Sequence, residues 1–181
     1  HAYARQEQAT DRRDALGEME AEFIGARDGL YQASVSETGW PYVQFRGGPA
    51  GFLRVLDAKT IGYADFRGNL QYISVGNLSK DDRVSIILMD YASKSRLKLF
   101  GRVRLVTRDE DPALLARLVV PGYRAVVQRG VVISVEGFDW NCPQHITPRF
   151  TEEEIRMVTA PLQDEIARLK KAVDELRRSG P

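Results

Sequence analysis

Cysteine is almost absent from this sequence, because Cys142 is the only one among 181 residues. A single cysteine excludes a disulfide bond within the chain. Without a CxxC or CxxxC pair, the sequence also offers no zinc or iron–sulfur motif, so we expect no metal site. Proteins without disulfide bonds are typical of reducing compartments. We therefore expect a cytoplasmic protein.

The sequence also lacks an excess of either charge, any long apolar run and the common nucleotide-binding loops. Lys and Arg total 26 against 25 Asp and Glu, so any anion site has to be local rather than a property of the whole surface. No apolar run approaches the ~18–20 residues of a membrane span, and no signal-peptide pattern stands at the start. Neither a Walker-type loop nor a GxGxxG motif after a strand is present. We expect a soluble protein that binds neither nucleic acid nor membrane.

What the sequence contains instead is a series of short strands. An amphipathic helix is expected over residues 11–24 and a second helix over 112–118. The predicted strands span residues 30–35, 41–46, 52–56, 60–64, 70–75, 84–89, 96–106 and 131–138. Many short strands with few, peripheral helices predict a mainly β protein, folded as a closed or nearly closed antiparallel barrel. We expect this barrel domain over residues 11–150.

The tail, residues 151–181, is predicted to be a C-terminal helical extension. Thr151 and Glu154 form a capping-box pattern, and Pro161 marks either a kink or a restart of the helix. Apolar residues then follow a 4-3-4-3 spacing: Leu162, Ile166, Leu169, Val173 and Leu176. This is a coiled-coil-like stripe. The alternatives are packing on its own domain, packing across a dimer, or a free coiled coil.

The loop over residues 137–149 gathers unusual side chains between a strand and the tail helix. It holds the only cysteine, Cys142, together with Trp140 and His145, the only histidine besides His1. Residues that carry chemistry favour loops held by a rigid scaffold. The loop therefore either contacts a ligand at the mouth of the barrel or closes the end of its core.

Polar residues with strand spacing form a second group of candidates. Gln44 and Arg46 share one face of their strand, and so do Arg96 and Lys98, because residues two apart point the same way. Such pairs suit an anion-binding groove or, alternatively, a solvated outer face. Residues 74–77, Ser-Val-Gly-Asn, are expected at a strand end before a helical turn from Ser79, where they either receive a phosphate or form a turn.

Several segments together resemble a known family. They are residues 39–53, 68–78, 89–91, 96–101 and 141–146, which include Gly-Asn, Ser-Val-Gly-Asn and Asn-Cys-Pro. In this order they resemble the pyridoxamine 5'-phosphate oxidase-like family of FMN-binding split β-barrels. The likeness covers roughly residues 20–150 and is closest to the branch described as predicted flavin-nucleotide-binding proteins.

The resemblance implies a homodimer with two FMN molecules, each in a groove at the subunit interface. It implies that Gln44, Arg46, Ser74 and Asn77 hold the phosphate and ribityl chain, and that Arg96 and Lys98 approach the isoalloxazine or the phosphate. The loop with Asn141 and His145 would reach the flavin from the partner chain. The cofactor-binding candidates are therefore Gln44, Arg46, Ser74, Gly76, Asn77, Arg96, Lys98, Asn141, Cys142 and Gln144.

The sequence departs from true pyridoxamine phosphate oxidases at three points. Gln44 stands where their phosphate strand has an arginine, their lysine position falls in the insertion at residues 47–51, and their C-terminal Arg-x-His motif is missing. Pyridoxamine phosphate is thus not the expected substrate. The resemblance implies an FMN-dependent oxidoreductase acting on an unidentified small molecule. The alternative is a non-catalytic flavin, haem or deazaflavin binder acting as carrier or sensor. Tyr91, Cys142 and His145 are the conceivable acid–base groups, but no catalytic residue is assigned.

Overall fold

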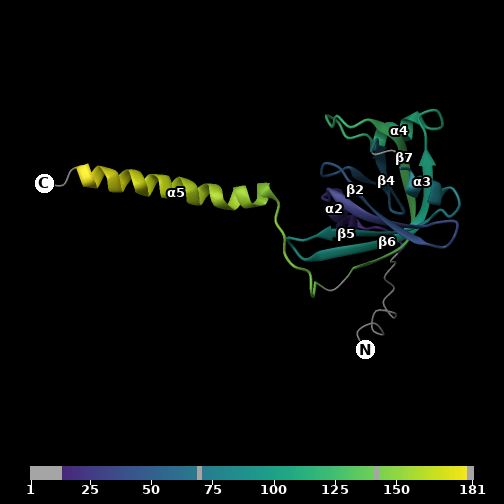
Figure 1. Ribbon diagram of the computed structural model, residues 1–181, viewed down its shortest axis with the longest axis horizontal. Helices are drawn as coiled ribbons and strands as arrows, with labels where there is room; N and C mark the ends of the chain where they lie inside the picture. Colours follow the sequence, from purple (N-terminus) through teal and green to yellow (C-terminus); the bar gives the residue numbers. More distant parts are fainter. Residues whose placement is uncertain (1–13, 69–70, 141–142, 179–181) are drawn as a thin grey trace. The chain divides into compact units, whose positions relative to one another are not determined.

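The computed structural model describes residues 14–68, 71–140 and 143–178. The chain divides into two compact units. One contains the residues up to 90 together with 95–144, and the other contains residues 91–94 together with those from 145 onward. Figure 1 identifies the helices and strands of each unit.

The first unit is built mainly from strands. Its elements are α2 (Glu18–Gly25), β1 (Gly29–Val35), β2 (Pro41–Gly47), β3 (Leu53–Asp57), β4 (Thr60–Phe66), α3 (Ile73–Leu78), β5 (Arg83–Asp90), β6 (Ser95–Val106), α4 (Pro112–Leu118) and β7 (Val127–Trp140). The second unit contains α5 (Glu152–Arg178). The expected mainly β fold with peripheral helices is confirmed.

The seven strands form one sheet in the order β2-β1-β5-β6-β7-β4-β3, and every pairing in it is antiparallel (Figure 1). Arg46 on β2 nevertheless lies 2.9 Å from Asp65 on β4, although four strands separate β2 from β4 in the sheet order. An ion pair across this separation requires the sheet to curl until its ends meet. The sheet therefore forms the antiparallel barrel that the strand pattern predicts.

The interior of the barrel follows the alternation of its long strands. On β6, Leu97 and Leu99 are buried, whereas Phe100 and Arg102 are exposed. On β7, Ile133 and its inward-facing neighbours are buried in the same cluster. Pro112 opens α4, and the Asp111 carboxylate accepts a hydrogen bond from the Leu114 backbone N–H, which caps the helix.

The expected strand over residues 70–75 is wrong. Residues 69 and 70 lie outside the described part, and from Ile73 the chain is helical. The sequence imitates a strand because apolar and polar residues alternate there, yet the buried residues are Ser74, Asn77 and Leu78, at the 3-4 spacing of a helix. Tyr72 adopts a left-handed conformation, with φ of 49°, at the start of α3. Ser74 is consequently a helical residue, and Ser79 ends the helix instead of beginning one.

Within the second unit, α5 runs from Glu152 to Arg178 with Pro161 inside it. The Thr151 side chain and Glu154 form the expected capping box, since Glu154 accepts from the Thr151 backbone N–H and Thr151 Oγ1 accepts from the Glu154 backbone N–H. The helix continues through Pro161, so this residue does not mark a restart. None of the helices in the described ranges has the length and apolar character needed to cross a membrane.

Candidate functional site: a polar pocket at the meeting point of the sheet ends

Two hollows with shared walls lie where β2 approaches β4. The larger has a volume of about 360 Å³ and the smaller about 50 Å³. Both are lined by Gln44, Arg46, Asp65, Phe66 and Gly68, and the smaller also by Gln71, Tyr72, Val75 and Gln128. We refer to these hollows and their walls as the polar pocket. A volume of this size lies within the range of about 300–1,000 Å³ that is usual for small-molecule sites.

Two arginines share one carboxylate at the wall of the polar pocket. Arg46 Nη1 donates to Asp65 Oδ1 at 2.9 Å, and Arg129 Nε lies 3.4 Å from Asp65 Oδ2. Asp65 is 4% exposed. Two guanidinium groups around one carboxylate leave this cluster with one net positive charge.

The cluster also has donors that nothing in the described protein uses. The Nε atoms of Arg46 and Arg129 are buried and have no hydrogen-bond partner, because the approach of Arg129 Nε to Asp65 does not have hydrogen-bond geometry. Burial raises the pKa of Asp65, and the charges of Arg46 and Arg129 oppose this rise. Buried guanidinium donors without acceptors are costly. The excess of positive charge beside the pocket favours an anion, and a phosphate suits guanidinium groups.

Uncharged polar groups extend the polar pocket toward α3 and β7. Ser74 Oγ donates to Gln44 Oε1 at 2.7 Å, which links α3 to β2. Gln128 Nε2 donates to the Tyr72 hydroxyl at 2.8 Å. The Arg129 guanidinium lies over the Tyr72 ring, 5.2 Å from its centre, a cation–π arrangement that holds the side chain in place. Hydroxyl and amide groups beside a cationic centre suit a polyol phosphate.

A second set of polar side chains lies buried beside these groups, on the inward face of β1. The Tyr63 hydroxyl donates to Gln32 Oε1 at 2.8 Å, and Asn77 Nδ2 donates to Ser34 Oγ at 3.0 Å. Gln32 Nε2 is buried without a partner. Burial raises the pKa of Tyr63 far above its usual value, so its hydroxyl stays protonated across the physiological range.

The residues expected from the sequence fall into three places. Gln44, Arg46 and Ser74 come together at the polar pocket, and Asn77 lies in the neighbouring buried polar set. Arg96 and Lys98 lie on the other face of the sheet, where Lys98 Nζ is 3.4 Å from Asp139 Oδ2. The last group is mixed: Gly76 has open space around its α-carbon, Gln144 is exposed in a turn, and Asn141 and Cys142 lie outside the described residues.

The outer face of β1 and β2 is apolar, which reverses the usual pattern of a sheet. Val43 is 61% exposed and Phe45 is 58% exposed, whereas the inward-facing neighbours of these residues are polar. The register places Phe45, Tyr31, Ile87 and Lys98 in one row across four strands, and Val43, Ala33, Ser85 and Phe100 in the next. We call these two rows the outer apolar face. An exposed apolar face of this kind marks an interaction surface.

The loop that the sequence singled out divides between the core and the second unit. Trp140 packs edge-on against Phe23 at 4.7 Å, and its Nε1 donates to the buried Glu20 carboxylate, so it closes the core. His145 is exposed in the second unit with φ of 64°. In the same unit, the Arg149 guanidinium lies over the Tyr91 ring. His145 and Tyr91 both belong to the second unit, whereas the residues that line the polar pocket belong to the first.

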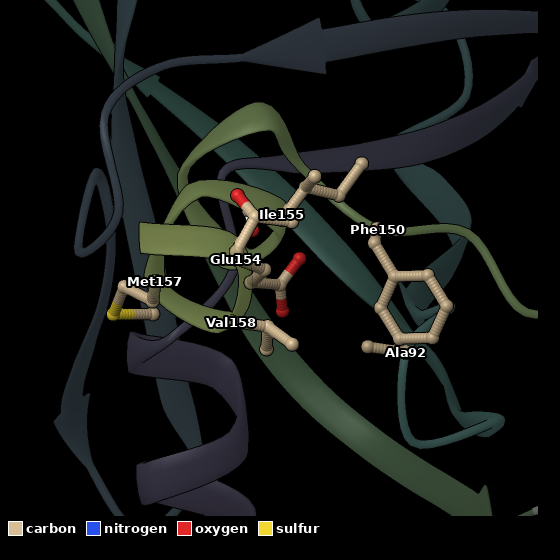
Figure 2. Close-up of a pocket in the computed structure, with 7 residues that line it drawn as sticks. Ala92, Phe150, Glu154, Ile155, Met157 and Val158 are labelled. Atoms are coloured by element: carbon tan, nitrogen blue, oxygen red, sulfur yellow. Dashed lines mark hydrogen bonds between the residues drawn. The ribbon is translucent and has the colours of Figure 1, made fainter. Parts of the chain in front are cut away.

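The second unit has an apolar hollow of its own, with a volume of about 450 Å³. Figure 2 shows Glu154, Ile155 and Val158 on the first turns of α5, with Phe150 across the hollow beside Ala92. Its one charged side chain, Glu154, is engaged in the capping box with Thr151. The hollow therefore offers apolar surface without a group suited to catalysis or to holding an anion.

Sequence reasoning missed Asp65, Arg129, Gln128 and Tyr72 in the polar pocket. Asp65 directly follows the apolar run over residues 60–64, and Arg129 precedes the one over 131–138. The available signal was that each of these two charged residues lies at the end of an apolar strand. The sequence does not show that β4 and β7 come close to β2 in the folded chain.

The comparisons with known proteins agree with this fold. Residues 18–136 match the family described as pyridoxamine 5'-phosphate oxidase, and the chain belongs to that family. No curated protein matches. Among solved structures, HupZ from group A Streptococcus has a TM-score of 0.56 at 16% identity, covering 75% of this chain and 99% of its own. A Lactobacillus delbrueckii protein, assigned provisionally to pyridoxamine 5'-phosphate oxidase, has a TM-score of 0.54 at 18% identity, covering 71% and 96%. These likenesses describe the fold.

Proposed function

We propose that this protein binds FMN, with the phosphate and ribityl chain in the polar pocket, and that it works as an oxidoreductase on a small molecule. The observation that carries the proposal is the net positive cluster of Arg46, Arg129 and Asp65 at a pocket of small-molecule size. Gln44 and Ser74 supply the polar groups for the ribityl chain. The family to which the chain belongs supports the same cofactor.

We further propose that the site is completed by a second copy of the chain. Gln44 and Arg46 face inward, whereas Arg96 and Lys98 lie on the outer face of the sheet. One sheet cannot turn both faces toward one ligand. In a homodimer that buries the outer apolar face, we propose that Arg96 and Lys98 of one subunit contact the flavin of the other, and that the loop with Asn141, Cys142 and Gln144 contributes to the same site.

FMN would supply the redox chemistry, and the chain would bind and orient it. In the polar pocket, Tyr63 stays protonated because its pKa is raised, so it is not suited to general acid–base work at neutral pH. The Asp65 carboxylate is engaged by two arginines, and burial raises its pKa against their charges. The pocket assigns no catalytic acid or base, which is compatible with hydride or electron transfer by the bound flavin and with the second candidate, a non-catalytic flavin carrier or sensor.

The test is an FMN titration of the full chain followed by flavin fluorescence, for the wild type and for Arg46→Ala. Loss of a charge-assisted contact to a partly buried phosphate costs about 1.5–3 kcal/mol, so we expect affinity to fall about ten- to a hundredfold. Arg102→Ala is the matched control, because Arg102 forms exposed ion pairs with Asp82 and Glu136. Its affinity should stay at the wild-type value.

The visible spectrum of the purified protein separates the cofactors, since oxidised flavin, deazaflavin and haem absorb differently. Reduction of bound FMN by NADH or NADPH, followed by reoxidation with an added acceptor, supports the oxidoreductase. Bound FMN that no nicotinamide donor reduces supports the carrier or sensor. Equal FMN affinity of the wild type and Arg46→Ala would remove the polar pocket from the proposal.

A further inference from the structure

The C-terminal helix α5 carries an apolar stripe that no other residue of its own unit buries. The helix contains 27 residues and none of them is buried. Leu162, Ile166, Leu169, Val173 and Leu176 are between 45% and 73% exposed. A sustained stripe of this kind on an isolated helix is unstable in water without a partner, because most helical stability comes from packing an apolar face.

The stripe has the residue types of a two-stranded coiled coil. In a heptad assignment, β-branched residues occupy the a positions, at Thr159, Ile166 and Val173. Leucine occupies the d positions at 162, 169 and 176. β-branched residues at a with leucine at d favour parallel dimers over higher assemblies. Pro161 falls at position c, on the side away from this seam.

The charges beside the stripe favour a parallel, in-register arrangement. Glu165 occupies a g position and Lys170 the following e position. In a parallel pair these two residues meet across the interface as opposite charges, once on each side. In an antiparallel pair e positions face e positions, which brings together only Arg156, Gln163, Lys170 and Arg177. None of these e positions carries a carboxylate, so the antiparallel arrangement gives Lys170 no opposite charge there.

The surface of α5 also has the shape that such a partner requires. A hollow on the helix is lined by Ile166, Leu169, Lys170 and Val173, with Asp174 and Arg177 at its edge. The first four are two successive a positions with the d and e positions between them. Four residues in this arrangement form the hole that receives one apolar side chain of a facing helix. A leucine at a d position of a second copy fits there.

Other occupants fit the helix less well. A 27-residue helix is about 40 Å long, which exceeds the ~30 Å diameter of a small domain, so one barrel cannot cover its whole length. The helix has seven acidic and six basic side chains. This balance gives it no attraction to an anionic membrane surface, where amphipathic helices are typically rich in Lys and Arg.

We propose that the α5 helices of two copies of this chain pair as a parallel, in-register coiled coil from about Thr159 to Leu176. This pairing links two subunits through their tails. It does not depend on FMN binding or on the outer apolar face, since it uses only residues of α5.

The test is disulfide cross-linking in the full chain, with Cys142→Ser as the background so that each variant has one cysteine. Leu162→Cys and Leu176→Cys place the thiol in the seam, and Asp164→Cys, at an f position, is the matched control. Diamide serves as the oxidant, and cross-linked dimer is measured on a denaturing gel. We expect rapid cross-linking at both seam positions and only background cross-linking at 164.

Each other outcome overturns the pairing. If both seam variants are as slow as Asp164→Cys, the helices do not pair. If neither cross-links alone but a mixture of Leu162→Cys and Val173→Cys does, the pairing is antiparallel, because a d position then faces an a position. A sedimentation mass above two chains for the unmodified protein overturns the two-stranded state.

A charge exchange tests the register independently. Glu165→Lys replaces two attractive contacts with two repulsive ones and should weaken tail pairing about fivefold, read as slower cross-linking of Leu176→Cys. The double variant Glu165→Lys with Lys170→Glu restores opposite charges across the interface and should restore the rate. Glu165 also pairs with Arg168 of its own helix at 2.7 Å, and Lys170→Glu does not restore that contact. A double variant that stays slow contradicts the predicted register.

Discussion

The half of the barrel sheet that contains β7, β4 and β3, which we call the ordinary end, and the half that begins with β2 and β1, which we call the reversed end, differ in the polarity of their alternating side chains. On β7, Val131, Ile133 and Val135 face inward and Ser134 and Glu136 face outward, as in an ordinary sheet with one solvated face. On β1 and β2, the inward Gln32, Ser34, Gln44 and Arg46 are polar and the outward Val43 and Phe45 are apolar, although Leu30 at the start of β1 belongs to the core. The strands are regular at both ends, so the difference in side-chain polarity reflects what each face of the sheet contacts.

The reversed end has two costs that a folded domain would avoid without a functional reason. Buried polar groups need partners, and exposed apolar groups promote association. The inward side meets the first cost with the contacts around Gln44, Arg46 and Asp65. The outward side, with Val43 and Phe45, is covered in our proposal by the second subunit. Single substitutions at each end of the sheet test this comparison.

The largest effect is expected at the ordinary end of the sheet. Ile133→Ala removes a fully buried side chain from the core and should lower the free energy of unfolding by about 2–5 kcal/mol. Urea denaturation followed by tryptophan fluorescence measures this change. Phe45→Ala, at the reversed end, should cost the isolated subunit much less because Phe45 is mostly exposed. Equal costs for the two variants would contradict the difference between the ends.

The second prediction concerns association through the outer apolar face. Phe45→Asp places a carboxylate on that face, and burying an unpaired charge at an interface costs several kcal/mol. We expect the barrel dimer to weaken by at least about a hundredfold, measured by sedimentation of a chain that ends at Arg149 so that the tail does not contribute. Far-ultraviolet circular dichroism should show an unchanged fold. An unaffected dimer would show that the outer apolar face is not the interface.

The third prediction concerns the charge of the polar pocket. The pKa of Asp65 is raised, so burying its negative charge costs more than Arg46 and Arg129 return. Asp65→Asn keeps an acceptor oxygen for Arg46 but removes the negative charge, so the net charge beside the phosphate rises by one unit. We expect FMN to bind several-fold more tightly, measured by the same titration as for Arg46→Ala. Weaker binding would mean that Asp65 is needed to position Arg46.

Sequence patterns predicted the strands well, and on β6 the alternation of residue types follows burial closely. Residues 70–75 failed because their alternation is compatible with a strand, while the helical conformation depends on burying Ser74 and Asn77 against β1 and β2. That contact is tertiary, and local propensity does not encode it. The continuation of α5 through Pro161 is likewise not determined by the proline alone.

The sequence predicts which residues of the candidate site share a strand face, but it does not predict which face points into the barrel. A period of two places Gln44 with Arg46, and Arg96 with Lys98, on shared faces. It does not say which face is the interior, and at β1 and β2 the usual assumption that polar residues face outward does not hold. Asp65 and Arg129 reach Arg46 only because the curled sheet brings β4 and β7 to β2.

The smallest effect is expected at Tyr63. This residue lies on β4, at the ordinary end of the sheet, and its hydroxyl donates a hydrogen bond to Gln32 on β1, at the reversed end. The raised pKa of Tyr63 means that the folded protein keeps the phenolic proton at a pH where the unfolded chain has released it. The unfolded state then binds fewer protons, so stability falls by up to about 1.4 kcal/mol for each pH unit above the ordinary tyrosine pKa of about 10. Tyr63→Phe should cost about 1 kcal/mol at neutral pH, through loss of the hydrogen bond to Gln32, and should remove this alkaline loss. Urea denaturation of both proteins at pH 8 and pH 11 measures the two terms. An unchanged pH dependence in Tyr63→Phe would mean that Tyr63 ionises in the folded state, and the buried polar set around Gln32 would then have to be open to solvent.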